Sequence, residues 1–198
     1  MTSTLWSMFA EKTRRMAGNA LSDIAGADDW NKVRPARRTE FLAALGLEPL
    51  PHRCDSGIRN FGETSGPGYR VRKIGFQLLP DCWASAAIYY TDPLPLERCL
   101  GVLYLCGHSA LGIHYHQAHP ALWARRGYVC LILETIEQTD NPGDHHGANL
   151  GWFEHWISLG YTAAGGEVWN SMRALDVLSE DPSVDPCRLA AMRGNRFG

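Results

Sequence analysis

Three short, almost uninterrupted apolar runs in the second half of the chain constrain its fold more than any other feature. They extend from Leu100 to Cys106, from Tyr128 to Glu134 and from Arg188 to Met192. Continuous runs of this kind, as opposed to alternating ones, are typical of strands that are buried on both faces in a parallel sheet covered by helices. The sequence therefore predicts an α/β domain built on parallel strands.

Helical segments separate these runs. One ends at Gly127, and a later one carries apolar residues with helical spacing, namely Val168, Trp169, Met172, Leu175 and Leu178. Spacings of one, three and four residues place such side chains on one stripe of a helix. We expect this stripe to pack against the sheet.

An antiparallel pair of strands is expected before the parallel set. Ile74, Phe76 and Leu78 alternate with more polar residues, and a strand-like composition resumes over 83–91 after a Pro-Asp interruption. The polar, glycine-containing stretch 55–68 is interpreted as a loop. Together with the three apolar runs, this gives a sheet of about five strands.

Two helices are expected in the N-terminal part of the chain. Leu5, Met8 and Phe9 have helical spacing, and a second helical stretch is expected to begin near Pro35. Gly46 follows the last apolar residues of that stretch and suits a C-terminal cap. No linker divides the chain, so the expected organisation is one domain over 1–198 with an N-terminal helical segment over 1–50.

Charge and hydropathy exclude several function classes. The 19 basic and 21 acidic residues give a net charge of −2, which provides no overall positive field for nucleic acid or an anionic membrane. No apolar run is long enough to span a bilayer, and charged residues interrupt the stretch 1–21, unlike a secretory signal. The cysteines form no C-x-x-C pair and are expected to be reduced. We expect a cytoplasmic protein with no nucleic-acid and no membrane partner.

Two motifs give the chain a family resemblance. The motif G-H-S-A-L-G at 107–112 follows a strand directly, and D-P-S-V-D-P-C-R-L-A-A-M at 181–192 follows a helix. On these motifs the chain resembles the α/β-hydrolase superfamily between Arg37 and Met192. It looks most like the bacterial branch of acetyl xylan esterases and dienelactone-hydrolase-like esterases.

This resemblance implies both a fold and an activity. The implied fold is an α/β-hydrolase-like three-layer sandwich, incomplete in this chain. The implied activity is hydrolysis of a carboxylic ester by a serine nucleophile, with a small ester or an acetylated carbohydrate as substrate. No cofactor and no metal are expected.

The family places a nucleophile elbow, G-x-S-x-G, after the last of these strands. Here residues 192–198 read M-R-G-N-R-F-G and contain no serine. By resemblance the nucleophile position falls on Asn195 or Arg196, and neither an amide nor a guanidinium can attack an ester carbonyl. The acid and the histidine of later strands are absent as well. We therefore expect the N-terminal part of a serine ester hydrolase, truncated at the elbow and inactive as written.

The loop after the first parallel strand corresponds to the oxyanion loop of the family. Its residues are Gly107, His108, Ser109 and Ala110. An alternative makes Ser109 the nucleophile, since Asp144 and His145 follow in the family's chain order. Leu111 argues against this alternative because the sharp elbow turn needs a small residue two positions after the serine.

Further candidate residues lie in the polar stretch 134–152, which by resemblance borders the substrate entrance. They are Asp144, His145 and Trp152.

His114, His116 and His119 raise a zinc or copper alternative. Their spacing at a helix start points the first two to different sides, so rim histidines are the preferred interpretation.

A competing function is a non-catalytic module that pairs with a partner, or with itself, through the exposed edge of the last strand.

Overall fold

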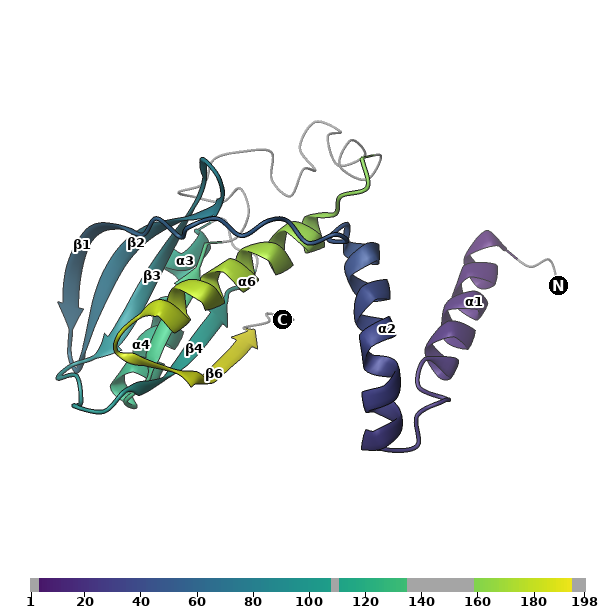
Figure 1. Cartoon of the computed structure of the whole chain (residues 1–198), viewed down its shortest axis with the longest axis horizontal. Helices are drawn as coiled ribbons and strands as arrows, with labels where there is room; N and C mark the ends of the chain where they lie inside the picture. The colour runs from purple at the N-terminus through teal and green to yellow at the C-terminus, as the bar shows by residue number, and fades with distance from the viewer. Residues whose placement is uncertain (1–3, 108–110, 135–158, 194–198) are drawn as a thin grey trace. The chain divides into compact units, whose positions relative to one another are not determined.

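The computed structural model describes residues 4–107, 111–134 and 159–193, and the chain divides into two compact units, 1–44 and 45–198 (Figure 1). The first unit holds helix α1 (Leu5–Asn19) and nearly all of helix α2 (Ala27–Leu45). Among the described helices, none combines the length and the apolar character needed to cross a bilayer. The predicted single domain stays a prediction.

Helix α2 begins earlier than expected. It starts at Ala27, so Pro35 lies inside it and does not open it. Asp28 and Asp29 occupy the first turn, where carboxylates are favoured by the helix dipole. That signal, and not the proline, marks the start. Gly46, at the other end, has a φ of 75°, as expected for a C-terminal cap.

The second unit is built on a six-stranded mixed sheet in the order β1-β2-β3-β5-β4-β6. Its strands are β1 (Arg59–Gly66), β2 (Tyr69–Leu79), β3 (Cys82–Thr91), β4 (Cys99–Leu105), β5 (Val129–Leu133) and β6 (Val184–Arg193). Strands β1, β2, β3 and β5 pair antiparallel, whereas β4 pairs parallel with both β5 and β6. The predicted antiparallel pair and the parallel pairing of the three apolar runs are both confirmed. The expected burial of 188–192 on both faces is wrong, because β6 is an edge strand among the described strands and most of its residues are exposed.

Strand β1 corrects the prediction of a loop over 55–68 and of about five strands. It pairs with β2 along the edge of the sheet, with a register shift between Asn60 and Glu63 and Gly62 at a φ of 114°. All its residues before Gly66 are exposed. An edge strand exposed on both faces has no apolar alternation, so the sequence carries no strand signal there.

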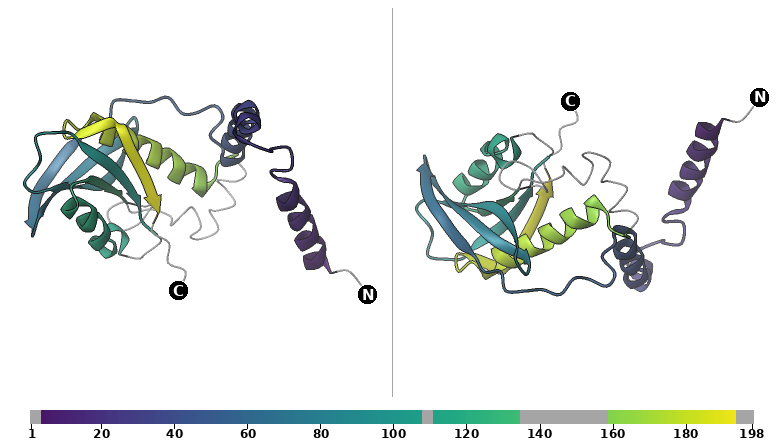
Figure 2. Two further views of the ribbon diagram at one scale, coloured as in Figure 1. Left: turned by 90° about the horizontal axis from the view of Figure 1, so that it is seen from below. Right: turned by 90° about the horizontal axis from the view of Figure 1, so that it is seen from above.

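Helices cover the two faces of this sheet. Helix α4 (Ala118–Arg125) lies on one face and α6 (Ala163–Glu180) on the other, as Figure 2 shows. Ala124 of α4 belongs to a buried cluster with Tyr104 and Ile132. Val177 of α6 belongs to a second cluster that contains Phe76 and Leu131. The expected three-layer α/β arrangement is therefore present.

The buried face of α6 differs in part from the predicted apolar stripe. Trp169 and Leu178 are buried, as expected, whereas Met172 and Leu175 are only half-buried. Arg173 lies in the buried row instead. In a sequence, a charged residue within a helix indicates a solvent-facing position, so the predicted apolar stripe lies about one residue away from the buried face.

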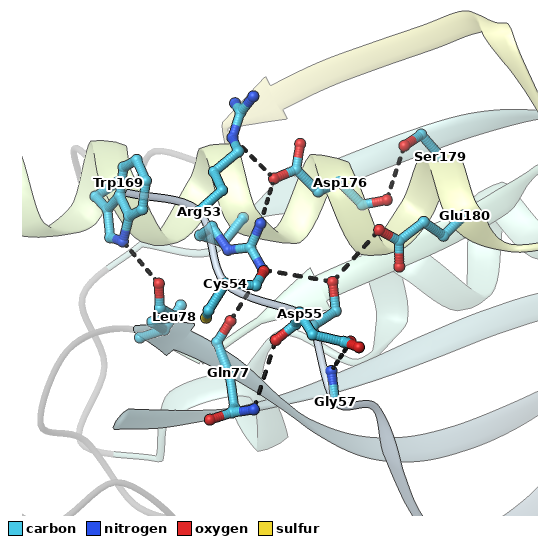
Figure 3. Close-up of polar contacts among 12 residues, drawn as sticks. Arg53, Cys54, Asp55, Gly57, Gln77, Leu78, Trp169, Asp176, Ser179 and Glu180 are labelled. Carbon is cyan, nitrogen blue, oxygen red and sulfur yellow. Dashed lines mark hydrogen bonds and ion pairs between the residues drawn. The ribbon is translucent and has the colours of Figure 1, made fainter. Parts of the chain in front are cut away.

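Contacts of the Arg173 guanidinium explain its burial. Its Nη1 donates to Asp176 Oδ2 at 2.6 Å, and its Nη2 donates to the carbonyl oxygens of Cys54 at 2.7 Å and Gln77 at 3.4 Å. Its Nε has no hydrogen-bond partner among the described residues. Figure 3 shows how Asp176, Cys54 and Gln77 come together from α6, the segment before β1, and β2. Arg173 therefore joins three separate parts of the unit.

Two adjacent tyrosines of β3 predict how stability depends on pH. Burial, then the neighbouring Tyr69 and Cys130, raises the pKa of Tyr89 to about 12. Burial and the hydrogen bond from Tyr90 to Asp181 Oδ2, 2.5 Å long, raise the pKa of Tyr90. In the unfolded chain both hydroxyls ionise near pH 10, so above that pH the folded state holds protons that the unfolded state has lost.

We therefore expect the free energy of unfolding to fall between about pH 10 and 12, by up to ~1.4 kcal/mol per tyrosine and pH unit. Urea unfolding measured from pH 7 to pH 12 checks this. The variant Tyr89→Phe should lose less stability over that interval than the unsubstituted protein. A free energy that stays unchanged through pH 12 would contradict the assignment.

Candidate functional site

Three parallel strands end at one edge of the sheet and define the candidate site. Leu105 at the end of β4 stands opposite both Leu133 of β5 and Arg193 of β6. Residues that follow these strands therefore meet along one line. Open α/β sheets bind their ligands in this position, outside the carboxyl ends of the strands. Gly107, the first residue of the predicted oxyanion loop, lies at this edge.

Glu134 follows β5 directly and is 1% exposed. Its backbone N–H donates to the carbonyl oxygen of Ser85 at 3.0 Å, and its Oε2 accepts the N–H of Ile113 at 3.4 Å. Its carboxylate also lies against Gly112, the first residue of helix α3 (Gly112–Tyr115), where a Cβ atom would come 2.3 Å from Oε1. Glu134 thus holds the chain just after the loop.

His116 holds the chain just before the loop. It is buried, and its Nε2 lies 3.0 Å from the carbonyl oxygen of Gly107. Because a carbonyl oxygen can only accept, His116 must carry a proton on Nε2 and donate it. The segment 108–110 is therefore bracketed by two buried polar side chains, His116 at Gly107 and Glu134 at Ile113.

The histidines that raised the metal alternative have different surroundings. His119 Nδ1 and the Tyr104 hydroxyl share a hydrogen bond of 2.9 Å, and the two rings stack with centroids 5.2 Å apart. Burial, followed by the nearby thiols of Cys106 and Cys130, raises the pKa of Tyr104. His114 is exposed. Within the described ranges, no group of three or more His, Cys, Asp or Glu residues is arranged to hold a metal ion.

Glu134 and His116 are the positioning groups that sequence reasoning missed. The sequence places Glu134 at the end of an apolar run and the start of a polar stretch, with no role of its own. It favours a rim position for His116, and that is wrong because the side chain is buried. The position of Glu134 directly after a buried strand was a usable signal. A carboxylate buried there needs a hydrogen-bond partner, because burying it unpaired is costly. His116 offered no such signal, since its partner is a backbone carbonyl.

Several predicted site residues lie outside the described residues. They are His108, Ser109 and Ala110 of the oxyanion loop, the entrance residues Asp144, His145 and Trp152, and the nucleophile positions Asn195 and Arg196. Of the predicted site, the structure therefore places Gly107.

Comparison with protein-family models and with curated proteins gives no match for this sequence. Solved structures do match. A methylesterase superposes with a TM-score of 0.72 at 19% identity, over 91% of this chain and 39% of its own. A glucuronoyl esterase from Solibacter usitatus gives 0.59 at 17% identity, over 88% and 55%. An acetyl xylan esterase from Paenibacillus sp. R4 gives 0.58 at 13% identity, over 80% and 51%.

These similarities confirm the expected α/β-hydrolase fold. The chain spans between 39% and 55% of the length of these three solved structures. At 13–19% identity, the likeness is one of fold.

Proposed function

We propose that this chain carries the oxyanion-loop part of a serine-type carboxylic-ester hydrolase. The observation that supports it best is the position of Gly107 just after the carboxyl end of β4, in a fold similar to that of three esterases. Backbone N–H groups of residues 107–110 would face the charge that develops on an ester carbonyl oxygen. His116 and Glu134 would fix the two ends of that loop.

The same proposal assigns no turnover to this chain. Residues 194–198, at the elbow position, read G-N-R-F-G and supply no hydroxyl or thiol nucleophile there. Half of an oxyanion hole in this fold comes from the residue after the nucleophile. The substrates we propose are small esters or acetylated carbohydrates, entering past Asp144, His145 and Trp152.

We expect hydrolysis of p-nitrophenyl acetate by the 198-residue chain to match the buffer rate, and Ser109→Ala to change nothing. Turnover that disappears in Ser109→Ala would instead establish Ser109 as the nucleophile. Turnover that survives this substitution would contradict the assignment of an inactive chain.

Ligand-observed NMR tests the binding half of the proposal. We expect saturation transfer to a mono-acetylated methyl xyloside to exceed transfer to the unmodified xyloside, since only the ester offers a carbonyl oxygen to the loop. The variant His116→Phe, which cannot donate to Gly107, should reduce this difference. Equal transfer to both sugars would contradict ester recognition.

The exposed edge of β6 favours a second candidate function, pairing with another chain by strand addition. Among the described strands β6 bonds only to β4, and Arg188, Ala190 and Ala191 are exposed. Such an edge presents unpaired backbone groups to a partner strand. A dimer in sedimentation velocity with β6 amides protected from hydrogen exchange would favour self-association over the ester proposal.

A further inference from the structure

An open groove of about 510 Å³ lies over strands β1 to β3, on the face that α4 covers farther along the sheet, and α3 borders it. Its volume falls in the range of small-molecule sites, roughly 300–1,000 Å³. Neither the fold nor the ester proposal uses it. The residues that shape its chemistry are Phe61, Thr64, Tyr69, Lys73, Tyr89 and Gln117.

Three aromatic residues line this groove, and two glycines make room for the rings of two of them. The Phe61 ring lies over β2 so closely that a Cβ atom on Gly75 would come 2.9 Å from it. The Tyr69 ring lies across Gly66, where a Cβ atom would come 2.4 Å from Cζ. Tyr69 in turn stacks on Tyr89, with centroids 5.9 Å apart. Phe61 remains 67% exposed, so one flat apolar surface faces solvent.

The groove carries positive charge although the chain as a whole is net negative. Lys73 is exposed on β2, and it forms no ion pair with a described residue. The described residues that line the groove include no Asp or Glu. Glu63 is the acidic residue of β1, but it pairs with Arg70 and Arg72 at 3.4 and 3.0 Å. Successive strand residues face opposite sides of the sheet, so Glu63, Arg70 and Arg72 lie on the face opposite Lys73.

We propose that this groove binds a small molecule whose carboxylate is carried on a ring, a uronic acid or an aromatic acid. Lys73 would pair with the carboxylate, and the exposed Phe61 ring and the Tyr69 ring would contact the ring of the ligand. Thr64 and Gln117 offer hydrogen bonds to its remaining polar groups. Binding here breaks no bond and uses none of residues 107–110, so it is independent of the ester proposal.

Isothermal titration of the full chain tests the inference with four probes. D-glucuronate and 4-hydroxybenzoate carry the carboxylate, whereas glucose and methyl 4-hydroxybenzoate are their uncharged counterparts. We expect at least one acid to bind about tenfold more tightly than its counterpart, the factor that one charge-assisted contact supplies. Lys73→Gln should remove that factor and Lys73→Arg should keep it.

Lys32→Gln is the matched control, because Lys32 is an exposed lysine of α2 outside the groove. It should bind the acid as the unsubstituted chain does. Binding of glucuronate alone identifies a sugar acid, and binding of hydroxybenzoate alone identifies an aromatic acid; both outcomes support the groove. Neither acid binding, equal binding of the uncharged counterparts, or unchanged binding by Lys73→Gln would overturn it. Ester turnover, or its absence, has no bearing on any of these outcomes.

Discussion

Replacing Arg173 with alanine is expected to lower the free energy of unfolding by about 3–6 kcal/mol, because two charge-assisted hydrogen bonds of about 1.5–3 kcal/mol each are lost, to Asp176 and to the carbonyl oxygen of Cys54. The guanidinium side chain is 3% exposed and holds Asp176 at 2.6 Å. The substitution also leaves the carbonyl oxygen of Cys54 without its 2.7 Å donor. Burying an unsatisfied acceptor is part of this loss.

A second arginine on the same carboxylate provides the control. Arg53 Nε lies 3.2 Å from Asp176 Oδ2, but its side chain is 54% exposed. Arg53→Ala should therefore cost less than about 1 kcal/mol. Urea unfolding of both variants at pH 7 gives the comparison. Equal losses would show that burial does not decide the contribution of an arginine at this site.

Periodicity in the sequence was sufficient to predict the centre of this fold but not its margins. Strands β4 and β5 are continuous apolar runs because helices cover both their faces, and burial leaves a direct trace in composition. Strand β1 is exposed on both faces, so its composition carries no trace of burial. The burial of Arg173 could not be predicted for a related reason, because its partners Cys54 and Gln77 lie 119 and 96 residues away in the sequence.

The same distinction between local and long-range information applies to the candidate site. The place of Gly107 follows from a local pattern, a glycine directly after a buried strand. The contact of Glu134 with Gly112 depends instead on the parallel register of β4 and β5, which aligns Leu105 with Leu133. Register sets which loops meet at the edge of a sheet, and no pattern within either loop reveals it.

Gly112→Ala is expected to destabilise the unit by about 2–5 kcal/mol, because a backbone cost and a packing cost coincide there. Gly112 has a φ of 49°, a left-handed conformation that costs a residue with a side chain about 1–2 kcal/mol. Its Cβ atom would also meet the buried Glu134 carboxylate at 2.3 Å. The carboxylate or the start of α3 must then move, and displacement within a packed interior typically costs about 1–3 kcal/mol.

Gly127→Ala separates these two costs. Gly127 has a φ of 89°, but a Cβ atom there meets no atom within 4 Å, so only the backbone cost of about 1–2 kcal/mol applies. The double variant Gly112→Ala with Glu134→Ala removes the obstructing carboxylate. Its loss in urea unfolding should fall short of the sum of the two single losses by about 1–3 kcal/mol. If the losses add, the carboxylate does not obstruct a side chain at position 112, and the hydrogen bond from the Ile113 N–H is what ties Glu134 to the start of α3.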